Sequence, residues 1–287
     1  MVGPLVAYLP TPRAEDGRVL TDALAVLVER AVAAGADAVA VLGSAGGFAY
    51  LDRAQRASVV SAAAGAVSGR VPLLAGIGAL TTSAAQEHAR DAGAAGADGL
   101  LLGTPTYLPL TTDEVVGLYR DVAAHAPAPL WAYHNPRTTS VELSVDDVRR
   151  IATLPGIAGV KDRGVDADDV RTRVAAYADL DVEVGISGDL LGVEGLLAGA
   201  RAWHCGLAGL LPELYVPVAR AAAGGDEAAV RAATSSLAPW AELSSTWGVA
   251  RLAVVLGPLL GLDLGTVPRP LLAPPDHVRE RVVALLG

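Results

Sequence analysis

Eight short apolar runs recur along the first two thirds of the chain, and none alternates regularly between hydrophobic and polar residues. Such runs indicate strands buried on both faces, as in a parallel sheet. They lie at residues 5–9, 38–43, 71–76, 98–103, 129–133, 156–161, 182–187 and 201–206. Between them lie helical stretches rich in Ala, Leu, Val, Glu and Arg. Strand and helix alternating eight times predict an α/β fold, a (β/α)8 TIM barrel.

Polar residues at the starts of several helical stretches support this division of the chain. Ser and Thr side chains cap helix N-termini by accepting a hydrogen bond from a free backbone N–H group. The capping residues expected here are Thr21, Thr111 and Ser144.

The strand pattern ends at about residue 223, and the remaining sequence has the composition of helices. We therefore expect a barrel catalytic domain over residues 1–223 and a C-terminal helical extension over residues 224–287. A doubly wound open sheet is the alternative. It is less favoured because no GxGxxG motif follows the first strand.

Composition and charge narrow the class of protein. Hydrophobic residues make up 52% and charged residues 18% of the 287 residues, as in a globular protein with a large core. The formal net charge of −9 argues against nucleic acid and anionic membranes as partners. No leader peptide is recognisable, and the longest apolar stretch, residues 252–262, is too short to span a bilayer. We expect a cytoplasmic protein.

Cysteine and histidine contribute little to the predicted chemistry. The single cysteine, Cys205, excludes an intramolecular disulfide and a cysteine-based metal site. The five histidines show neither an HExxH motif nor another paired spacing. The sequence therefore predicts a site without a metal.

Lys161 is the only lysine in a chain that otherwise uses arginine for its basic residues. It ends the apolar run 156–161, and in barrels of this type the chemistry lies at the C-terminal ends of the strands. Arginine stays protonated, whereas a desolvated lysine can lose its proton and attack a carbonyl to form a Schiff base. The sequence thus predicts that Lys161 is a nucleophile.

Other polar residues follow the ends of other predicted strands. Tyr133 and Tyr107 could shuttle protons to a Schiff-base intermediate, with the Ser44 hydroxyl as a relay. Glycines around Ser44, in "GSAGG", would let backbone N–H groups approach a carboxylate. This loop lacks the GxSxG spacing, so a serine hydrolase is not indicated. His204 is either a packed histidine or a pocket residue.

These motifs, in this order, resemble the dihydrodipicolinate synthase/N-acetylneuraminate lyase family of class I, pyruvate-handling aldolases. The similarity extends over nearly the whole chain and rests on eight segments. They are "GPLVAYLPTPRAEDGRVL", "GSAGGFAYLDRAQR", "LLAGIGALTTSAA", "GADGLLLGTPTYLP", "YHNPRTT", "GVKD", "SGD" and "VPRPLLAP".

The resemblance implies a role for each matching position. Lys161 would form the Schiff base, and Tyr133 would be the general acid/base. Tyr107 matches a tyrosine that the family places across a dimer interface in a proton relay, and Ser44 matches the first threonine of the family's GTTGE loop. The backbone amides of Ser44 and Ala45 would hold the carboxylate of the keto acid.

Several positions depart from the family pattern and suggest a different second substrate. Ala45 replaces the second threonine of GTTGE, and Gly47 replaces its glutamate. Thr138 stands where dihydrodipicolinate synthases carry an arginine for the second substrate's carboxylate, although Arg137 is adjacent. His204 stands where the family usually has a small aliphatic residue.

The sequence therefore predicts a Schiff-base class I aldolase or lyase that joins a 2-keto acid, such as pyruvate, to an aldehyde or runs the reverse cleavage. No cofactor is implied. One alternative is a 2-keto-3-deoxy sugar-acid dehydratase using the same lysine and tyrosine. Another is a family member that binds keto acids without turnover. The resemblance also implies a homodimer or homotetramer.

Overall fold

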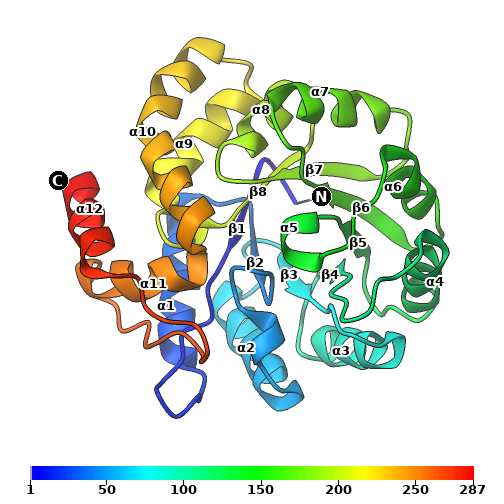
Figure 1. Ribbon diagram of the computed structural model, residues 1–287, viewed down its shortest axis with the longest axis horizontal. Coiled ribbons are helices and arrows are strands. Elements are labelled where there is room, and N and C mark those ends of the chain that lie inside the picture. Colours follow the sequence, from blue (N-terminus) through cyan, green and yellow to red (C-terminus); the bar gives the residue numbers. More distant parts are fainter. Residues whose placement is uncertain (1) are drawn as a thin grey trace.

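The computed structural model describes residues 2–287, and its eight parallel strands form a closed barrel (Figure 1). Each strand pairs with the next along the chain, and the last pairs back onto the first. The strands are β1 (Leu5–Tyr8), β2 (Ala38–Val41), β3 (Leu73–Gly76), β4 (Gly99–Gly103), β5 (Leu130–Tyr133), β6 (Ile157–Asp162), β7 (Glu183–Ser187) and β8 (Ala202–Cys205). The predicted TIM barrel and its eight strands are confirmed.

Helices connect the strands and surround the barrel (Figure 1). They are α1 (Thr21–Ala34), α2 (Arg53–Val67), α3 (Thr82–Ala94), α4 (Thr112–Ala123), α5 (Pro136–Thr139), α6 (Val145–Ala152), α7 (Ala167–Ala176), α8 (Leu191–Leu197) and α9 (Pro212–Ala223). Two 3₁₀ turns, Phe48–Tyr50 and Leu207–Gly209, follow β2 and β8.

The chain after α9 is helical, as the sequence predicts. It forms α10 (Glu227–Trp247), α11 (Val249–Leu259) and α12 (Asp276–Leu286). Figure 1 shows these three helices together on one side of the barrel, beside α9 and α1. The C-terminal end of α10 and the start of α11 reach the cavity at the barrel mouth, so the helical segment contributes to the candidate site.

Two of the three predicted capping residues are confirmed, and one is wrong. Thr111 and Ser144 cap α4 and α6, each within a capping box. Thr21 is instead the first helical residue of α1, and Leu20 occupies the capping position without a side-chain hydrogen bond. The backbone explains the difference, because Leu20 N–H donates to Pro12 O at 2.9 Å and this pairing leads the chain into the helix.

The barrel interior is packed around two large rings, Trp131 and His204, whose centroids lie 5.1 Å apart. Glycines on the neighbouring strands make room for them. A Cβ atom at Gly159 would lie 2.4 Å from the Trp131 ring, and one at Gly185 would lie 2.2 Å from His204 Nε2. These glycines therefore serve packing inside the barrel, where side chains from several strands meet.

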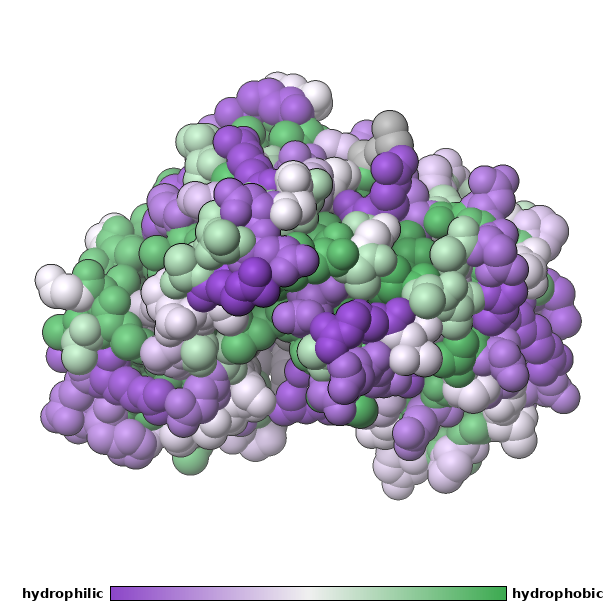
Figure 2. Space-filling view, turned by 90° about the horizontal axis from the view of Figure 1, so that it is seen from above, coloured by the Kyte–Doolittle hydropathy of each residue, from purple (hydrophilic) through white to green (hydrophobic). Residues whose placement is uncertain are grey.

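The surface gives no indication of membrane insertion by a helix. Among residues 2–287, no helix has both the length and the apolar character needed to cross a bilayer. The face shown in Figure 2 mixes hydrophilic and hydrophobic residues instead of presenting one continuous apolar band.

Candidate active site

A cavity of about 390 Å³ opens at the C-terminal ends of the barrel strands. Its walls combine strand ends with the loops that follow them and with the helical segment after α9. The residues that line the cavity include Tyr8, Ser44, Ala45, Tyr133, Asn135, Arg137, Thr138, Lys161, Arg163, Gly188, Asp189, His204, Ser244 and Ser245. This is the end of the barrel at which the sequence places the chemistry.

Lys161 lies between two tyrosine rings at the floor of this cavity. Its Nζ is 3.7 Å from the ring centroid of Tyr8 and 4.1 Å from that of Tyr133. Tyr133 and Lys161 are also direct partners in the β5–β6 ladder, which places both side chains on the same side of the sheet. Only 5% of Lys161 is exposed.

Burial lowers the pKa of Lys161, because a charged ammonium group loses its hydration in this position. The nearby Tyr133 opposes this effect, and the positive charge of Arg163 adds to it. The net lowering increases the fraction of neutral amine, which is the form that can attack a carbonyl group.

Three polar side chains surround the hydroxyl of Tyr133. Asn135 Nδ2 donates to it at 2.9 Å, Thr138 Oγ1 lies 3.2 Å away and Ser44 Oγ lies 3.4 Å away. Burial would raise the pKa of Tyr133, but the charge of Lys161 and these three hydrogen bonds lower it overall. The structure thus brings Ser44, Tyr133 and Lys161 together, as the sequence predicts.

The loop after β2 presents free backbone donors to the same cavity. Within residues 2–287, the amide groups of Ser44 and Ala45 donate no hydrogen bond to a backbone or side-chain acceptor. Both residues line the cavity, together with Lys161. Unpaired N–H groups in a glycine-rich turn form a site for a small anion such as a carboxylate.

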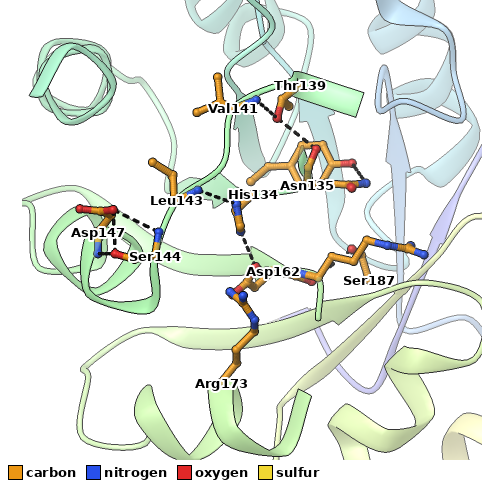
Figure 3. A network of polar contacts seen from close by, with 12 residues as sticks. His134, Asn135, Thr139, Val141, Leu143, Ser144, Asp147, Asp162, Arg173 and Ser187 are labelled. Atoms are coloured by element: carbon orange, nitrogen blue, oxygen red, sulfur yellow. Dashed lines mark hydrogen bonds and ion pairs between the residues drawn. The ribbon is translucent and has the colours of Figure 1, made fainter. Parts of the chain in front are cut away.

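A buried network of polar contacts is centred on His134 and Asp162, which directly follow Tyr133 and Lys161 in the chain (Figure 3). Asp162 accepts hydrogen bonds from His134 Nδ1 at 2.7 Å and from the Tyr177 hydroxyl at 2.6 Å, and it pairs with Arg173 at 3.1 Å. His134 Nε2 accepts from Leu143 N–H, so its proton lies on Nδ1 and points to the carboxylate. Burial alone would raise the pKa of Asp162, but the partners lower it.

Comparison with known proteins agrees with this geometry. The sequence profile of the "Dihydrodipicolinate synthetase family" matches residues 1–286. The chain belongs to the dihydrodipicolinate synthetase family. The resemblance seen in the sequence is confirmed.

Individual members of the family show how far the similarity extends. An uncharacterised DapA-like lyase of Halobacterium salinarum is 33% identical over 288 residues, which cover 100% of this chain and 92% of the relative. A 4-hydroxy-tetrahydrodipicolinate synthase of Thioalkalivibrio sulfidiphilus is 36% identical over 80% of this chain and 78% of its own length. The relative named as a lyase therefore matches the whole chain, and the relative named as a synthase matches four fifths of it.

Solved structures of the family have the same fold. The dihydrodipicolinate synthase of Agrobacterium tumefaciens superposes with a TM-score of 0.94 at 36% identity, covering 99% of this chain and 97% of its own. The dihydrodipicolinate synthase of Acinetobacter baumannii, crystallised with pyruvate, gives a TM-score of 0.93 at 26% identity, over 100% and 98% of the two chains.

Two of the positions that depart from the family pattern, Thr138 and His204, line the cavity. The Thr138 hydroxyl contacts the Tyr133 hydroxyl. Arg137 also lines the cavity, and its guanidinium donates to Ser245 at 3.3 Å. His204 is 2% exposed, its Nδ1 lies 3.0 Å from the Tyr8 hydroxyl and its ring packs against Trp131, so this histidine is a packed residue that also lines the cavity.

Tyr107 is the one predicted catalytic residue that the fold of a single chain does not bring to the cavity. It is 89% exposed on the loop after β4. In the family resemblance this tyrosine acts across a dimer interface, and that role stays a prediction here.

Sequence reasoning missed Tyr8, Asn135 and Arg163 as parts of the site. Tyr8 could have been found, because it closes the first strand just as Tyr133 closes the fifth. Asn135 stands in the "YHNP" segment, but its contact with Tyr133 depends on the turn that begins α5. Arg163 lies beyond the end of its predicted strand.

The described part of the chain has no evident place for a metal ion. Residues 2–287 contain no group of three or more His, Cys, Asp or Glu side chains positioned to bind a metal ion. The basic and hydroxyl-bearing residues of the cavity suit an organic anion instead.

Proposed function

We propose that this protein is a Schiff-base class I aldolase or lyase acting on a 2-keto acid, with Lys161 as the nucleophile. The observation that carries the proposal is the position of Lys161, buried between two tyrosine rings with a lowered pKa and paired with Tyr133 across two strands. A neutral amine beside a general acid/base is the arrangement that imine formation requires.

The chemistry begins at the keto carbon. Neutral Lys161 Nζ adds to C2 of the keto acid, Tyr133 transfers the protons, and loss of water leaves an imine. The backbone amides of Ser44 and Ala45 hold the substrate carboxylate during this step. Removal of a proton from C3 then gives an enamine, with Tyr133 and the hydroxyl groups around it handling the proton.

The enamine forms the new carbon–carbon bond. Its C3 attacks the carbonyl carbon of an aldehyde, and the aldehyde oxygen takes up a proton. Water then hydrolyses the imine, which releases the product and regenerates the free amine of Lys161. The same steps in reverse cleave the product into a keto acid and an aldehyde.

Borohydride reduction in the presence of pyruvate tests this proposal directly. Because Lys161 is the only lysine, an adduct found by peptide mass spectrometry can lie only on Lys161 or on the terminal amine. We expect it on Lys161, and we expect none there in Lys161→Arg, since arginine does not give up its proton. No adduct with pyruvate or with a panel of 2-keto acids would contradict the mechanism and leave a keto-acid-binding protein.

Product analysis with sugar acids separates the remaining reaction types. Carbon–carbon cleavage supports the aldolase. Loss of water with the carbon chain intact would identify a 2-keto-3-deoxy sugar-acid dehydratase instead.

A further inference from the structure

A second polar region of the cavity lies across the barrel from the Ser44–Ala45 loop. It is built around Arg163, which directly follows the end of β6 and lines the cavity together with Lys161. In a closed barrel of eight strands, β6 lies opposite β2. A keto acid held by the Ser44–Ala45 amides and bonded to Lys161 therefore has Arg163 on its far side.

Within residues 2–287 the guanidinium of Arg163 has no hydrogen-bond or ion-pair partner. Among residues 2–287 it is the one buried or half-buried arginine whose side chain makes neither a hydrogen bond nor an ion pair. The others all bind carboxylates or backbone carbonyls, and they are Arg13, Arg30, Arg56, Arg149, Arg173 and Arg251. A half-buried cation without a partner is costly unless a ligand supplies one.

The Arg163 guanidinium lies against the backbone of Gly188, which directly follows the end of β7. A Cβ atom at Gly188 would lie 3.0 Å from Arg163 Nη1, so the arginine lies against the backbone there. Gly188 also has a φ of +118°, a conformation that side-chain-bearing residues rarely adopt. The absence of a side chain at position 188 thus leaves the space that Arg163 uses at the cavity wall.

Burial lowers the pKa of Arg163 and the negative charge of the nearby Asp189 acts to raise it, but the two side chains form no ion pair or hydrogen bond with each other. Asp189 is the one carboxylate among the described residues that line the cavity, and other groups already engage it. Its oxygens accept from Leu207 N–H at 3.1 Å, from Cys205 Sγ at 3.3 Å and from the Ser244 hydroxyl. This leaves Arg163 free to bind a ligand.

Arg137 adds a second positive charge to the same wall. It lines the cavity, and after burial its charge is the largest influence that lowers the pKa of Arg163. Ser245 holds it only through contacts of 3.3 Å. Two guanidinium groups therefore face one cavity in a protein whose formal net charge is −9.

We infer that Arg163, assisted by Arg137, binds an oxyanion on the second substrate, at the end remote from its aldehyde. The group is a carboxylate or a phosphate, because the planar fork of arginine binds both in a bidentate manner. This inference rests on the proposed function, and it identifies the acceptor as an anionic aldehyde. Arg163 is then a specificity-determining residue that acts on acceptor binding.

Matched pairs of acceptors test the inference with pyruvate as the donor. Succinic semialdehyde is compared with its methyl ester, and glyceraldehyde 3-phosphate with glyceraldehyde. We expect kcat/KM to favour one anionic member over its neutral partner by about tenfold to a hundredfold, the range of a hydrogen-bonded charge. The pair that shows the preference distinguishes carboxylate from phosphate.

Substitutions assign the preference to Arg163. Arg163→Gln should reduce it about tenfold or more, mainly through KM of the anionic acceptor. Arg163→Lys keeps the charge beside Lys161 but loses the fork, so it should recover only part of the preference. Arg90→Gln is the control, because Arg90 is exposed, lies outside the cavity and makes no side-chain hydrogen bond or ion pair within residues 2–287.

Two outcomes would overturn the inference. One is equal use of anionic and neutral acceptors by the unmodified protein. The other is an equal loss with both acceptors in Arg163→Gln, which would mean that Arg163 supports Lys161 and not the acceptor.

A binding measurement separates this inference from the proposed function. Succinate cannot form a Schiff base, and its calorimetric binding should weaken about tenfold or more in Arg163→Gln whether or not borohydride traps pyruvate. Failure to trap pyruvate or any member of the panel of 2-keto acids, with weaker succinate binding in Arg163→Gln, would refute the proposed function and leave Arg163 as an anion-binding residue. Unchanged succinate binding in Arg163→Gln, with trapping intact, would refute the role of Arg163 alone.

Discussion

His134 Nδ1 lies 2.7 Å from Asp162 Oδ1, where His134 directly follows Tyr133 at the end of β5 and Asp162 follows Lys161 as the last residue of β6. The backbone of His134 also donates to Lys161 O at 2.9 Å. Because successive residues of a strand point to opposite faces, this buried pair lies behind the sheet while Tyr133 and Lys161 face the cavity. The pair therefore supports the backbone that carries Tyr133 and Lys161, and neither His134 nor Asp162 lines the cavity.

Replacing Asp162 with asparagine should destabilise the protein strongly. The change removes a buried charge that binds His134, Tyr177 and Arg173, and it leaves Arg173 without its buried partner. We expect the free energy of unfolding to fall by about 2–4 kcal/mol. Urea denaturation measures it, with Asp181→Asn as the control, because Asp181 is exposed and makes no side-chain hydrogen bond within residues 2–287. Equal effects of the two changes would contradict the role of the network.

The rate of adduct formation with pyruvate should depend on pH in a defined direction. The neutral amine of Lys161 reacts, so the rate rises as pH increases through its pKa and then levels off. Burial lowers this pKa from the ordinary value of 10.5, so the midpoint should lie below 10.5. Arg163 contributes to the lowering, so Arg163→Gln should move the midpoint upward and Arg163→Lys should not. A midpoint at the ordinary value would show that Lys161 is solvated.

Tyr133→Phe should separate binding from proton transfer. The ring remains beside Lys161, but the hydroxyl that contacts Ser44, Thr138 and Asn135 is lost. We expect kcat to fall about 10²- to 10⁴-fold, the usual contribution of a general acid/base. Steady-state kinetics measures this, with Tyr50→Phe as the control, because Tyr50 is exposed and lies outside the cavity. Turnover that survives in Tyr133→Phe would assign the proton to another group, such as Tyr8.

Gly185→Ala should disturb the barrel interior through His204. The added methyl group would lie 2.2 Å from His204 Nε2, and overpacking of this kind costs about 1–3 kcal/mol. Gly65→Ala, inside α2, is the control, because its Cβ would meet nothing within 4 Å and alanine favours a helix. The double variant Gly185→Ala/His204→Ala should lose less stability than the two single changes add up to. Additive losses would contradict direct contact.

The loop after β4 should take part in self-association. Tyr107 and Leu108 are adjacent on this loop and are 89% and 69% exposed, so together they present apolar surface that a partner subunit could cover. We expect a homodimer or homotetramer by light scattering, and we expect Leu108→Asp to shift it towards the monomer. Val165→Asp is the control, because Val165 is 84% exposed on a different loop. A monomeric protein, or an effect of Val165→Asp as large as that of Leu108→Asp, would exclude this interface.

The periodicity of the chain by itself determined the architecture. Eight unalternating apolar runs corresponded to eight strands, because a strand buried on both faces needs apolar side chains throughout. The sequence also indicated that Lys161 lies in the cavity, because a single lysine at a strand end, in a chain that otherwise uses arginine, suggests a group that can lose its proton. The local sequence predicted the wrong capping residue for α1. The helix is preceded by Leu20, whose backbone N–H donates to Pro12 O, and not by Thr21.

Only the tertiary structure decided which residues share the cavity. Tyr8, Asn135 and Arg163 join Lys161 through barrel closure and loop conformation, which bring together positions far apart in the sequence. The packing of His204 against Gly185, and the space that Gly188 leaves for Arg163, likewise depend on contacts between neighbouring strands and loops. The local pattern of apolar residues determines which segments are buried. The distances between side chains on different strands are set only when the barrel closes.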